Sequence, residues 1–220
     1  MPNEVEGLAQ LAATSPGVCD PCGLRRVTAD DADQATEILA LAFLEDPAWS
    51  WAFSDPDRRL DHLRAWWGLH IESAVPHEWV WMTEDGSAAA LWIPPGKPEL
   101  SEEGEARSEP LLRELLGDRA DIVAEFIDLF ESNHPNDAPS YYLSLLGTHP
   151  DHRGGGEGMG LLTANLELID REGMPAYLES SNSANDHRYE RLGFERVGEF
   201  TRPDENATVA TMWRDPPETG

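Results

Sequence analysis

Apolar residues recur along this chain at two spacings, one typical of helices and one typical of strands. The alternation over 24–28 predicts a short strand. A helix is predicted to begin near Thr28, where aspartates favour a helix N-terminus, and to end before Pro47. Spacings of three and four residues between apolar side chains predict a second amphipathic helix over 58–74.

A β-hairpin is the clearest local signal in the first half of the chain. Asp85-Gly86 is a preferred two-residue hairpin turn, and the segments 78–83 and 88–93 on either side are short and apolar. This pattern predicts two antiparallel strands.

The region 97–137 carries four basic and twelve acidic residues. We expect its first part, up to Pro110, to be a polar connection. Helical spacing then occurs over 111–116 and 123–130. The whole region therefore predicts a helical insertion at the surface.

Strands and helices alternate in the second half, which predicts an α/β domain. The expected elements are a strand over 141–148, a helix over 157–171, a strand over 176–180, a short helix near 185–192, and strands over 194–200 and 208–213. We expect one domain over 24–216, preceded by a disordered or loosely attached tail over 1–23.

The chain has 220 residues and a formal net charge of −26. Such acidity repels phosphate backbones and anionic lipid, so neither nucleic acid nor a membrane is an expected partner. A hydrophobic content of 40% with eight tryptophans is too high for a disordered acidic chain. The acidity suits either a high-salt cytoplasm or a pocket for a cation, and composition does not choose between them.

The two cysteines, Cys19 and Cys22, are too few for a disulfide scaffold, and we read their spacing as neither a redox nor a zinc site. His149 and His152 lie in a loop and are not expected to bind metal. The chain shows neither a basic leader nor a spanning apolar run, so we expect a soluble cytoplasmic protein.

A glycine-rich turn between a predicted strand and a predicted helix carries most of the chemistry. Glycines let the backbone approach a ligand, and the free N–H groups of a helix N-terminus bind anions. A P-loop would need a Gly-Lys-Ser/Thr ending, which this turn lacks. A dinucleotide fingerprint remains an alternative, with Glu179 near the expected distance, but the turn comes late in the chain.

The spacing of this turn resembles motif A of the GCN5-related N-acetyltransferases, Arg/Gln-x-x-Gly-x-Gly/Ala, through Arg153, Gly156 and Gly158. A second block resembles motif B of the same family, a strand followed by a helix: Leu178-Glu179-Ser180-Ser181, then Asn185, Tyr189 and Gly193-Phe194. The order of these segments and their residues are similar to those of the puromycin N-acetyltransferase branch of the family. The resemblance covers about residues 24–213.

The resemblance implies a central mixed and splayed β-sheet flanked by helices, with acetyl-CoA as cosubstrate and no metal. Acetyl-CoA would lie between two splayed parallel strands, 141–148 and 176–180. Residues implied to bind it come from the first strand, the turn and motif B: Leu146, Gly147, Thr148, Arg153, Gly154, Gly155, Gly156, Glu157, Gly158, Met159 and Asn185.

Two side chains are implied to act in catalysis. Tyr189 holds the position from which the family's tyrosine protonates the departing thiolate, and a packed aromatic residue on the last helix is the less favoured alternative. Glu179, on the second central strand, is a candidate base, and a structural carboxylate is an equal reading. An amide near Leu146 is the expected oxyanion donor.

The resemblance implies direct transfer of an acetyl group to a primary amine of a small molecule. Eight acidic and no basic residues lie between Thr28 and Asp57, together with Trp49 and Trp51, so the acceptor could be a cation or antibiotic-like. A solvated acidic face is the alternative for this segment. A protein N-terminus or lysine as acceptor, or an inactive CoA-binding sensor, also remain open, and a homodimer is one expected assembly.

Overall fold

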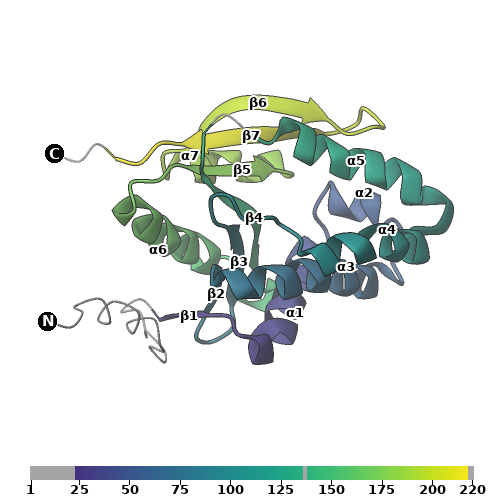
Figure 1. The fold of residues 1–220 in the computed structure, drawn as a ribbon, viewed down its shortest axis with the longest axis horizontal. Helices are drawn as coiled ribbons and strands as arrows, with labels where there is room; N and C mark the ends of the chain where they lie inside the picture. The colour runs from purple at the N-terminus through teal and green to yellow at the C-terminus, as the bar shows by residue number, and fades with distance from the viewer. Residues whose placement is uncertain (1–22, 136–137, 218–220) are drawn as a thin grey trace, which may run out of the picture.

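Seven strands form one mixed β-sheet in the computed structural model, which describes residues 23–135 and 138–217 (Figure 1). They are β1 (Leu24–Arg26), β2 (Val80–Thr83), β3 (Ala88–Ile93), β4 (Tyr141–Thr148), β5 (Ala176–Ser180), β6 (Glu195–Thr201) and β7 (Thr208–Arg214). Their order across the sheet is β1-β2-β3-β4-β5-β7-β6. Neighbouring strands are antiparallel except β4 and β5, so the predicted mixed sheet is confirmed.

Helices flank this sheet, as predicted. They are α1 (Ala32–Phe43), α2 (Trp49–Ala52), α3 (Arg59–Ala74), α4 (Glu102–Leu116), α5 (Ala120–Asn133), α6 (Glu157–Arg171) and α7 (Asp186–Glu190). In the described part of the chain, none of them combines the length and apolar character needed to cross a membrane.

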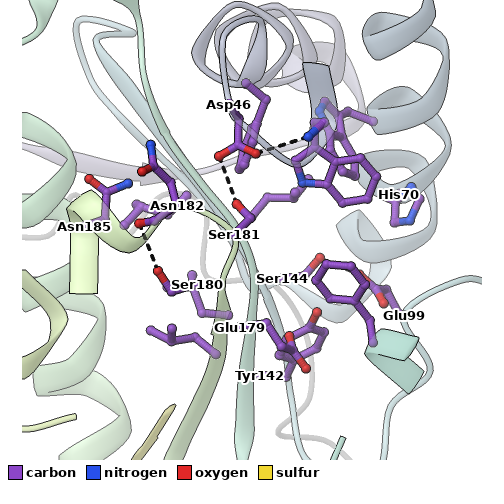
Figure 2. A pocket seen from close by; sticks show the side chains of 18 of the residues that line it. Asp46, His70, Glu99, Tyr142, Ser144, Glu179, Ser180, Ser181, Asn182 and Asn185 are labelled. Atoms are coloured by element: carbon purple, nitrogen blue, oxygen red, sulfur yellow. Dashed lines mark hydrogen bonds between the residues drawn. The ribbon is translucent and has the colours of Figure 1, made fainter. Parts of the chain in front are cut away.

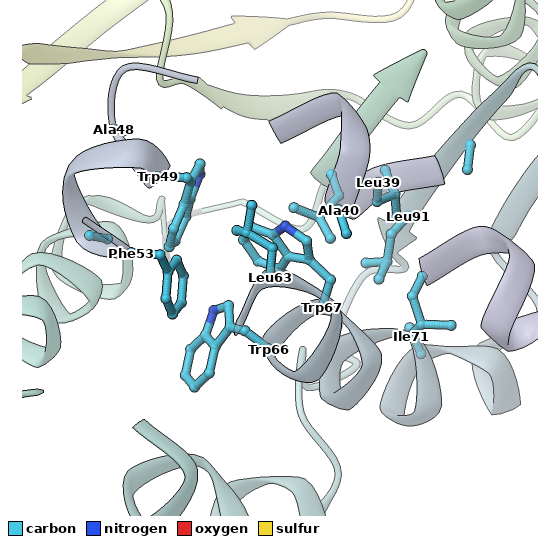
Figure 3. Packing of buried hydrophobic residues seen from close by; sticks show 14 of the residues in the cluster. Leu39, Ala40, Ala48, Trp49, Phe53, Leu63, Trp66, Trp67, Ile71 and Leu91 are labelled. Atoms are coloured by element: carbon cyan, nitrogen blue, oxygen red, sulfur yellow. The ribbon is translucent and has the colours of Figure 1, made fainter. Parts of the chain in front are cut away.

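Side chains of β3 are buried on both faces of the sheet because they alternate between two hydrophobic clusters. Ala88, Ala90 and Trp92 join the cluster that contains α6, whereas Ala89 and Leu91 join the cluster that contains α1 and α3. Figure 3 shows the second cluster, in which Phe53, just after α2, packs with side chains of α1, α2 and α3: Leu39, Ala40, Trp49, Leu63, Trp66 and Trp67.

The parallel pairing of β4 with β5 is short. It covers three residue pairs, from Tyr141–Ala176 to Leu143–Leu178, and then the strands separate. Over 144–148, β4 pairs with β3 on one edge and has no partner strand among the described residues on the other. Backbone groups along this edge are therefore open to a ligand, and the predicted splay is confirmed.

A β-bulge at Ser144 changes which way β4 presents its side chains. Leu145 lies opposite Leu91 and Leu143 lies opposite Trp92, so Ser144 is one extra residue in β4. An extra residue reverses the alternation of a strand. Leu143 accordingly packs in the cluster of α6, while Leu145 packs in the cluster of α1 and α3.

The prediction that 97–110 is a polar connection was wrong for its second part. The α4 helix begins at Glu102 and continues through Pro110. Ser101 caps it by accepting a hydrogen bond from the N–H of Gly104, at 3.1 Å, and carboxylates follow in the first turn. Much of this helix is exposed, so its early turns carry no apolar stripe to reveal them.

The predicted tail over 1–23 lies outside the described residues except for Gly23, and so do Cys19 and Cys22. The short helix α2 had no counterpart in the predictions. The single domain over 24–216 and the insertion over 97–137 stay predictions.

We expect Gly147→Ala to destabilise the protein, because α1 lies directly against β4 at this residue. An added Cβ would lie 2.6 Å from Ala42 Cβ and 3.1 Å from Leu39 Cδ2. Overpacking of this kind costs about 1–3 kcal/mol. Urea unfolding would measure it.

Gly160→Ala is the matched control, because its added Cβ meets nothing within 4 Å and the residue lies inside α6. It should stabilise the chain by roughly 0.5–1 kcal/mol. Equal unfolding midpoints for the two variants would contradict the close packing of α1 on β4.

Candidate active site

Two connected cavities lie where β4 and β5 separate. The outer groove has a volume of about 760 Å³ and the inner cavity about 100 Å³. The residues that line both are Phe43, Asp46, Leu146, Asn182, Asn185 and Tyr189. A ligand in the groove would therefore meet a second ligand in the inner cavity at the splayed edge of β4.

The outer groove is bounded by the glycine-rich turn that connects β4 to α6. Gly154 and Gly156 have φ of 90° and 92°, a left-handed conformation that favours glycine, and Gly156 is the N-cap of α6. An added Cβ on Gly158 would overlap Thr148 Oγ1, so glycine lets the start of α6 approach β4. The free N–H groups of α6 thus lie beside the groove.

The structure brings together nearly all residues implied to bind acetyl-CoA. Those that line the groove are Leu146, Gly147, Thr148, Arg153, Gly154, Gly156, Glu157, Gly158, Met159 and Asn185, whereas Gly155 does not line it. Arg153 also donates a hydrogen bond from Nη2 to the carbonyl of Ala42, at 2.9 Å, which ties the turn to the end of α1.

Three basic side chains on the groove were missed from the sequence. His187, Arg188 and Arg191 lie in or directly after α7 and line the groove opposite the glycine-rich turn. In the sequence, these side chains are marked only by the run of charged residues over 186–191, inside motif B. Arg188 and Arg191 place positive charge on a groove that Glu45, Asp46 and Glu157 also line, and their guanidinium groups suit a ligand with phosphate groups.

Carboxylates and aromatic rings line the inner cavity, as Figure 2 shows in part. The carboxylates are Asp46, Glu99 and Glu179, and neither arginine nor lysine is among the described residues that line it. The aromatic residues are Phe43, Trp49, Trp66, Trp67, Phe130, Tyr142 and Tyr189. Such a cavity favours a cationic ligand with apolar surface.

Asp46 is held by three hydrogen bonds. Its carboxylate accepts from the N–H of Ala48 at 2.9 Å, from the N–H of Trp49 at 3.2 Å and from Ser181 Oγ at 2.9 Å (Figure 2). Burial raises the pKa of Asp46, and the hydrogen bond from Ser181 and the two amides oppose that rise. Asp46 therefore joins the α1–α2 connection to the end of β5.

Glu179 is in a different environment. Its side chain is 1% exposed, and burial raises its pKa, while His134, Tyr142 and Tyr177 lower it by favouring the charged form. Neither carboxylate oxygen has a hydrogen bond of good geometry within the described residues. A buried carboxylate with unsatisfied oxygens, lining a cavity, is suited to take up a proton.

Tyr189 lies at the junction of the two cavities. Its ring packs edge-on against Phe194, with ring centroids 6.2 Å apart. Burial raises its pKa to about 12, and Asp46 and Asp186 contribute to the rise. The phenol is therefore protonated at neutral pH, as a proton donor must be.

The prediction from the acidic segment 28–57 holds only in part. Trp49 and Asp46 line the inner cavity, but Glu99 and Glu179 come from other segments. The expectation for Trp51 was wrong: it does not line the cavity, and the Arg202 guanidinium lies 4.7 Å from its ring centroid.

Comparisons with known proteins identify acetyltransferases. An uncharacterized N-acetyltransferase of Schizosaccharomyces pombe is 26% identical in an alignment of 214 positions that covers 87% of this chain and 83% of that protein. A solved structure from Corynebacterium glutamicum, described as histone acetyltransferase HPA2 and related acetyltransferase, has a TM-score of 0.64 and 23% identity, over 89% of this chain and 97% of that one. No protein-family model matches the chain.

A second solved structure is the Drosophila melanogaster polyamine N-acetyltransferase, with a TM-score of 0.59 and 16% identity over 87% of this chain and 98% of that one. These likenesses confirm the fold that the two motifs implied. The puromycin-like branch stays a prediction.

Arg191→Gln should weaken binding of coenzyme A, because it removes a positive charge from the groove. The expected loss is about 1 kcal/mol, or roughly fivefold in Kd, measured by calorimetry. Arg171→Gln removes an exposed arginine at the far end of α6 and should leave Kd unchanged. Equal affinities of the two variants for coenzyme A would contradict a role of Arg191 in binding it.

Proposed function

Because the chain is an acyltransferase of the GCN5-related N-acetyltransferase type, we propose that it transfers the acetyl group of acetyl-CoA directly to a primary amine of a small cationic molecule. The observation that carries this proposal is the inner cavity. Three carboxylates and a set of aromatic rings line it, and it meets the outer groove beside β4. That arrangement suits an ammonium group presented to a thioester.

The outer groove is the site proposed for acetyl-CoA. Its backbone N–H donors at the start of α6 suit a pyrophosphate, and Arg188 and Arg191 add positive charge. The open edge of β4 over 144–148 supplies backbone groups for the pantetheine chain. These features fit the ligand without any metal, and the described residues contain no group of three or more metal-ligating side chains.

Size favours a small acceptor over a protein. The inner cavity measures about 100 Å³, and side chains of α3 and α5 help to enclose it, among them Trp66 and Phe130. A solved structure of similar fold is named a polyamine N-acetyltransferase, and polyamines are small cations. A protein N-terminus or lysine, and an inactive CoA-binding sensor, remain the alternatives that the experiments below separate.

The reaction begins with an ammonium group that must lose a proton before its nitrogen can attack. Glu179 is the proposed base, because both of its buried oxygens are available, whereas Asp46 already accepts three hydrogen bonds. Its raised pKa makes it a stronger base than an ordinary carboxylate.

Attack forms the C–N bond and a tetrahedral oxyanion, which a backbone amide near Leu146 would stabilise. Collapse breaks the C–S bond, the thiolate takes a proton from the phenol of Tyr189, and the second proton of the attacking nitrogen restores that phenol. Asp46 and Asp186 raise the pKa of this phenol, and a cationic acceptor beside Asp46 would offset them. The pKa of the Tyr189 phenol is therefore closest to that of the thiol when the acceptor is bound.

Tyr189→Phe should lower kcat by tenfold or more and leave KM for acetyl-CoA little changed, because only the proton donated in the transition state is removed. Thiol release followed with a thiol-reactive dye measures both constants. An unchanged kcat would remove Tyr189 from the mechanism.

A panel of acceptors tests the proposed function itself. We expect turnover with an aminonucleoside, a polyamine or an aminoglycoside, and little with glutamate or with a lysine-containing peptide, because the cavity is acidic and small. Turnover on the peptide alone would support the protein-acceptor alternative. A thermal shift with acetyl-CoA but no turnover on any amine would support the sensor.

Glu179→Gln should lower kcat by about a hundredfold or more, as loss of a general base does. The wild-type carboxylate must be ionised to act, so kcat/KM should be present above its raised pKa and be lost as pH falls through that pKa. A variant that keeps both the wild-type rate and the acid limb of the pH profile would rule out Glu179 as the base.

A further inference from the structure

His134 lies beside Glu179 in a narrow position between two tyrosines. It directly follows α5, and its Nδ1 is 3.8 Å from Glu179 Oε1. Its ring meets those of Tyr142 and Tyr177 edge-on, with centroids 4.7 Å and 5.0 Å apart and interplanar angles of 79° and 77°. Two phenol rings thus hold the imidazole next to the carboxylate.

The two partners differ sharply in their access to solvent. The Glu179 side chain is 1% exposed and the His134 side chain is 33% exposed. A proton on Glu179 is therefore shielded from bulk solvent, whereas a proton on His134 is not. His134 therefore connects the buried carboxylate to the outside of the protein.

We propose that His134 is a positioning residue that relays the acceptor's proton from Glu179 to solvent. This inference rests on the proposed function, since it requires Glu179 to act as the base. Histidine is suited to such a role because its ring takes up and releases protons near neutral pH.

The proton balance of the reaction requires an exit of this kind. The acceptor enters as an ammonium and leaves as an amide, so its nitrogen loses two protons in each turnover. The thiolate gains one proton, supplied through Tyr189, and the second proton must reach solvent. In the proposed relay it passes from the amine to Glu179, then to His134, and then to water, which restores Glu179 for the next cycle.

Other groups near Glu179 are less suited to carry this proton. Burial and the neighbouring Glu179 raise the pKa values of Tyr142 and Tyr177, so both phenols stay protonated and have no vacant site for a further proton near neutral pH. His70 also lines the cavity, but its Nδ1 lies 2.9 Å from the carbonyl of Trp66 and its side chain is buried.

The groups that set the pH dependence lie on all the elements that meet here. Glu179 and Tyr177 belong to β5, and Tyr142 belongs to β4. The charge of Glu99, ahead of α4, helps to raise the pKa of Tyr142 and that of Glu131 in α5. The Glu179 carboxylate lies within 4 Å of the imidazole.

The test compares the wild-type chain with His134→Gln, using acetyl-CoA and the panel amine with the highest kcat/KM. His134→Gln should lower kcat at least tenfold and leave KM for acetyl-CoA unchanged. Because His134 lowers the pKa of Glu179, its loss should raise that pKa. The acid limb of kcat/KM should then move to higher pH, since the base is lost earlier as pH falls.

His134→Ala supplies a second readout. The site is partly exposed, so free imidazole added to this variant should restore part of kcat, which a purely structural histidine would not show. Ser132→Ala is the matched control at the same end of α5: its Oγ bonds only the carbonyl of Asp128 among the described residues, and it should keep the wild-type rate and pH profile.

The outcomes separate the two hypotheses. A wild-type chain that acetylates no amine overturns the proposed function and the relay together. An active wild-type chain overturns the relay alone if His134→Gln keeps its kcat and acid limb. The relay is also overturned if His134→Ala melts normally yet loses activity that imidazole does not restore.

Discussion

The early separation of β4 from β5 is the constraint on which the rest of this structure depends. The strands pair over only three residue pairs, which leaves the backbone of 144–148 open on one edge. The bulge at Ser144 then turns the remaining side chains of β4 to the opposite faces of the sheet. The groove and the inner cavity share lining residues at this open edge, so the two proposed ligands would meet there.

The charge of −26 is unevenly distributed around that edge. Fixed N–H donors of α6, together with Arg188 and Arg191, lie on the outer groove, whereas carboxylates line the inner cavity. An acidic protein can therefore hold a phosphate-bearing ligand on one side and a cation on the other. Glu45, Asp46 and Glu157 also line the groove, so its favourable surroundings for phosphate are confined to the start of α6 and the two arginines.

The three carboxylates that line the inner cavity differ in their ability to accept a proton because their hydrogen-bond partners differ. Asp46 is satisfied by two amides and Ser181, so it fixes the chain. Ser144 donates a hydrogen bond to Glu99 on the cavity wall. Glu179 alone of the three is deeply buried with unsatisfied oxygens in the described structure, and it has an imidazole beside it. Environment, and not residue type, assigns their roles.

Local pattern determined much of this protein: the strand 141–148, the helix 157–171 and the strand 176–180 have the predicted bounds, and the glycine-rich turn lies on the groove. These features depend on neighbours in sequence, which periodicity and turn chemistry report directly. Only the tertiary structure brought Glu99 and His134 to Glu179, because they come from separate segments whose approach depends on how α4 and α5 pack. The burial of an acidic side chain without hydrogen-bond partners likewise has no local signal, and this burial distinguishes Glu179 from Asp46 and Glu99 among the described residues.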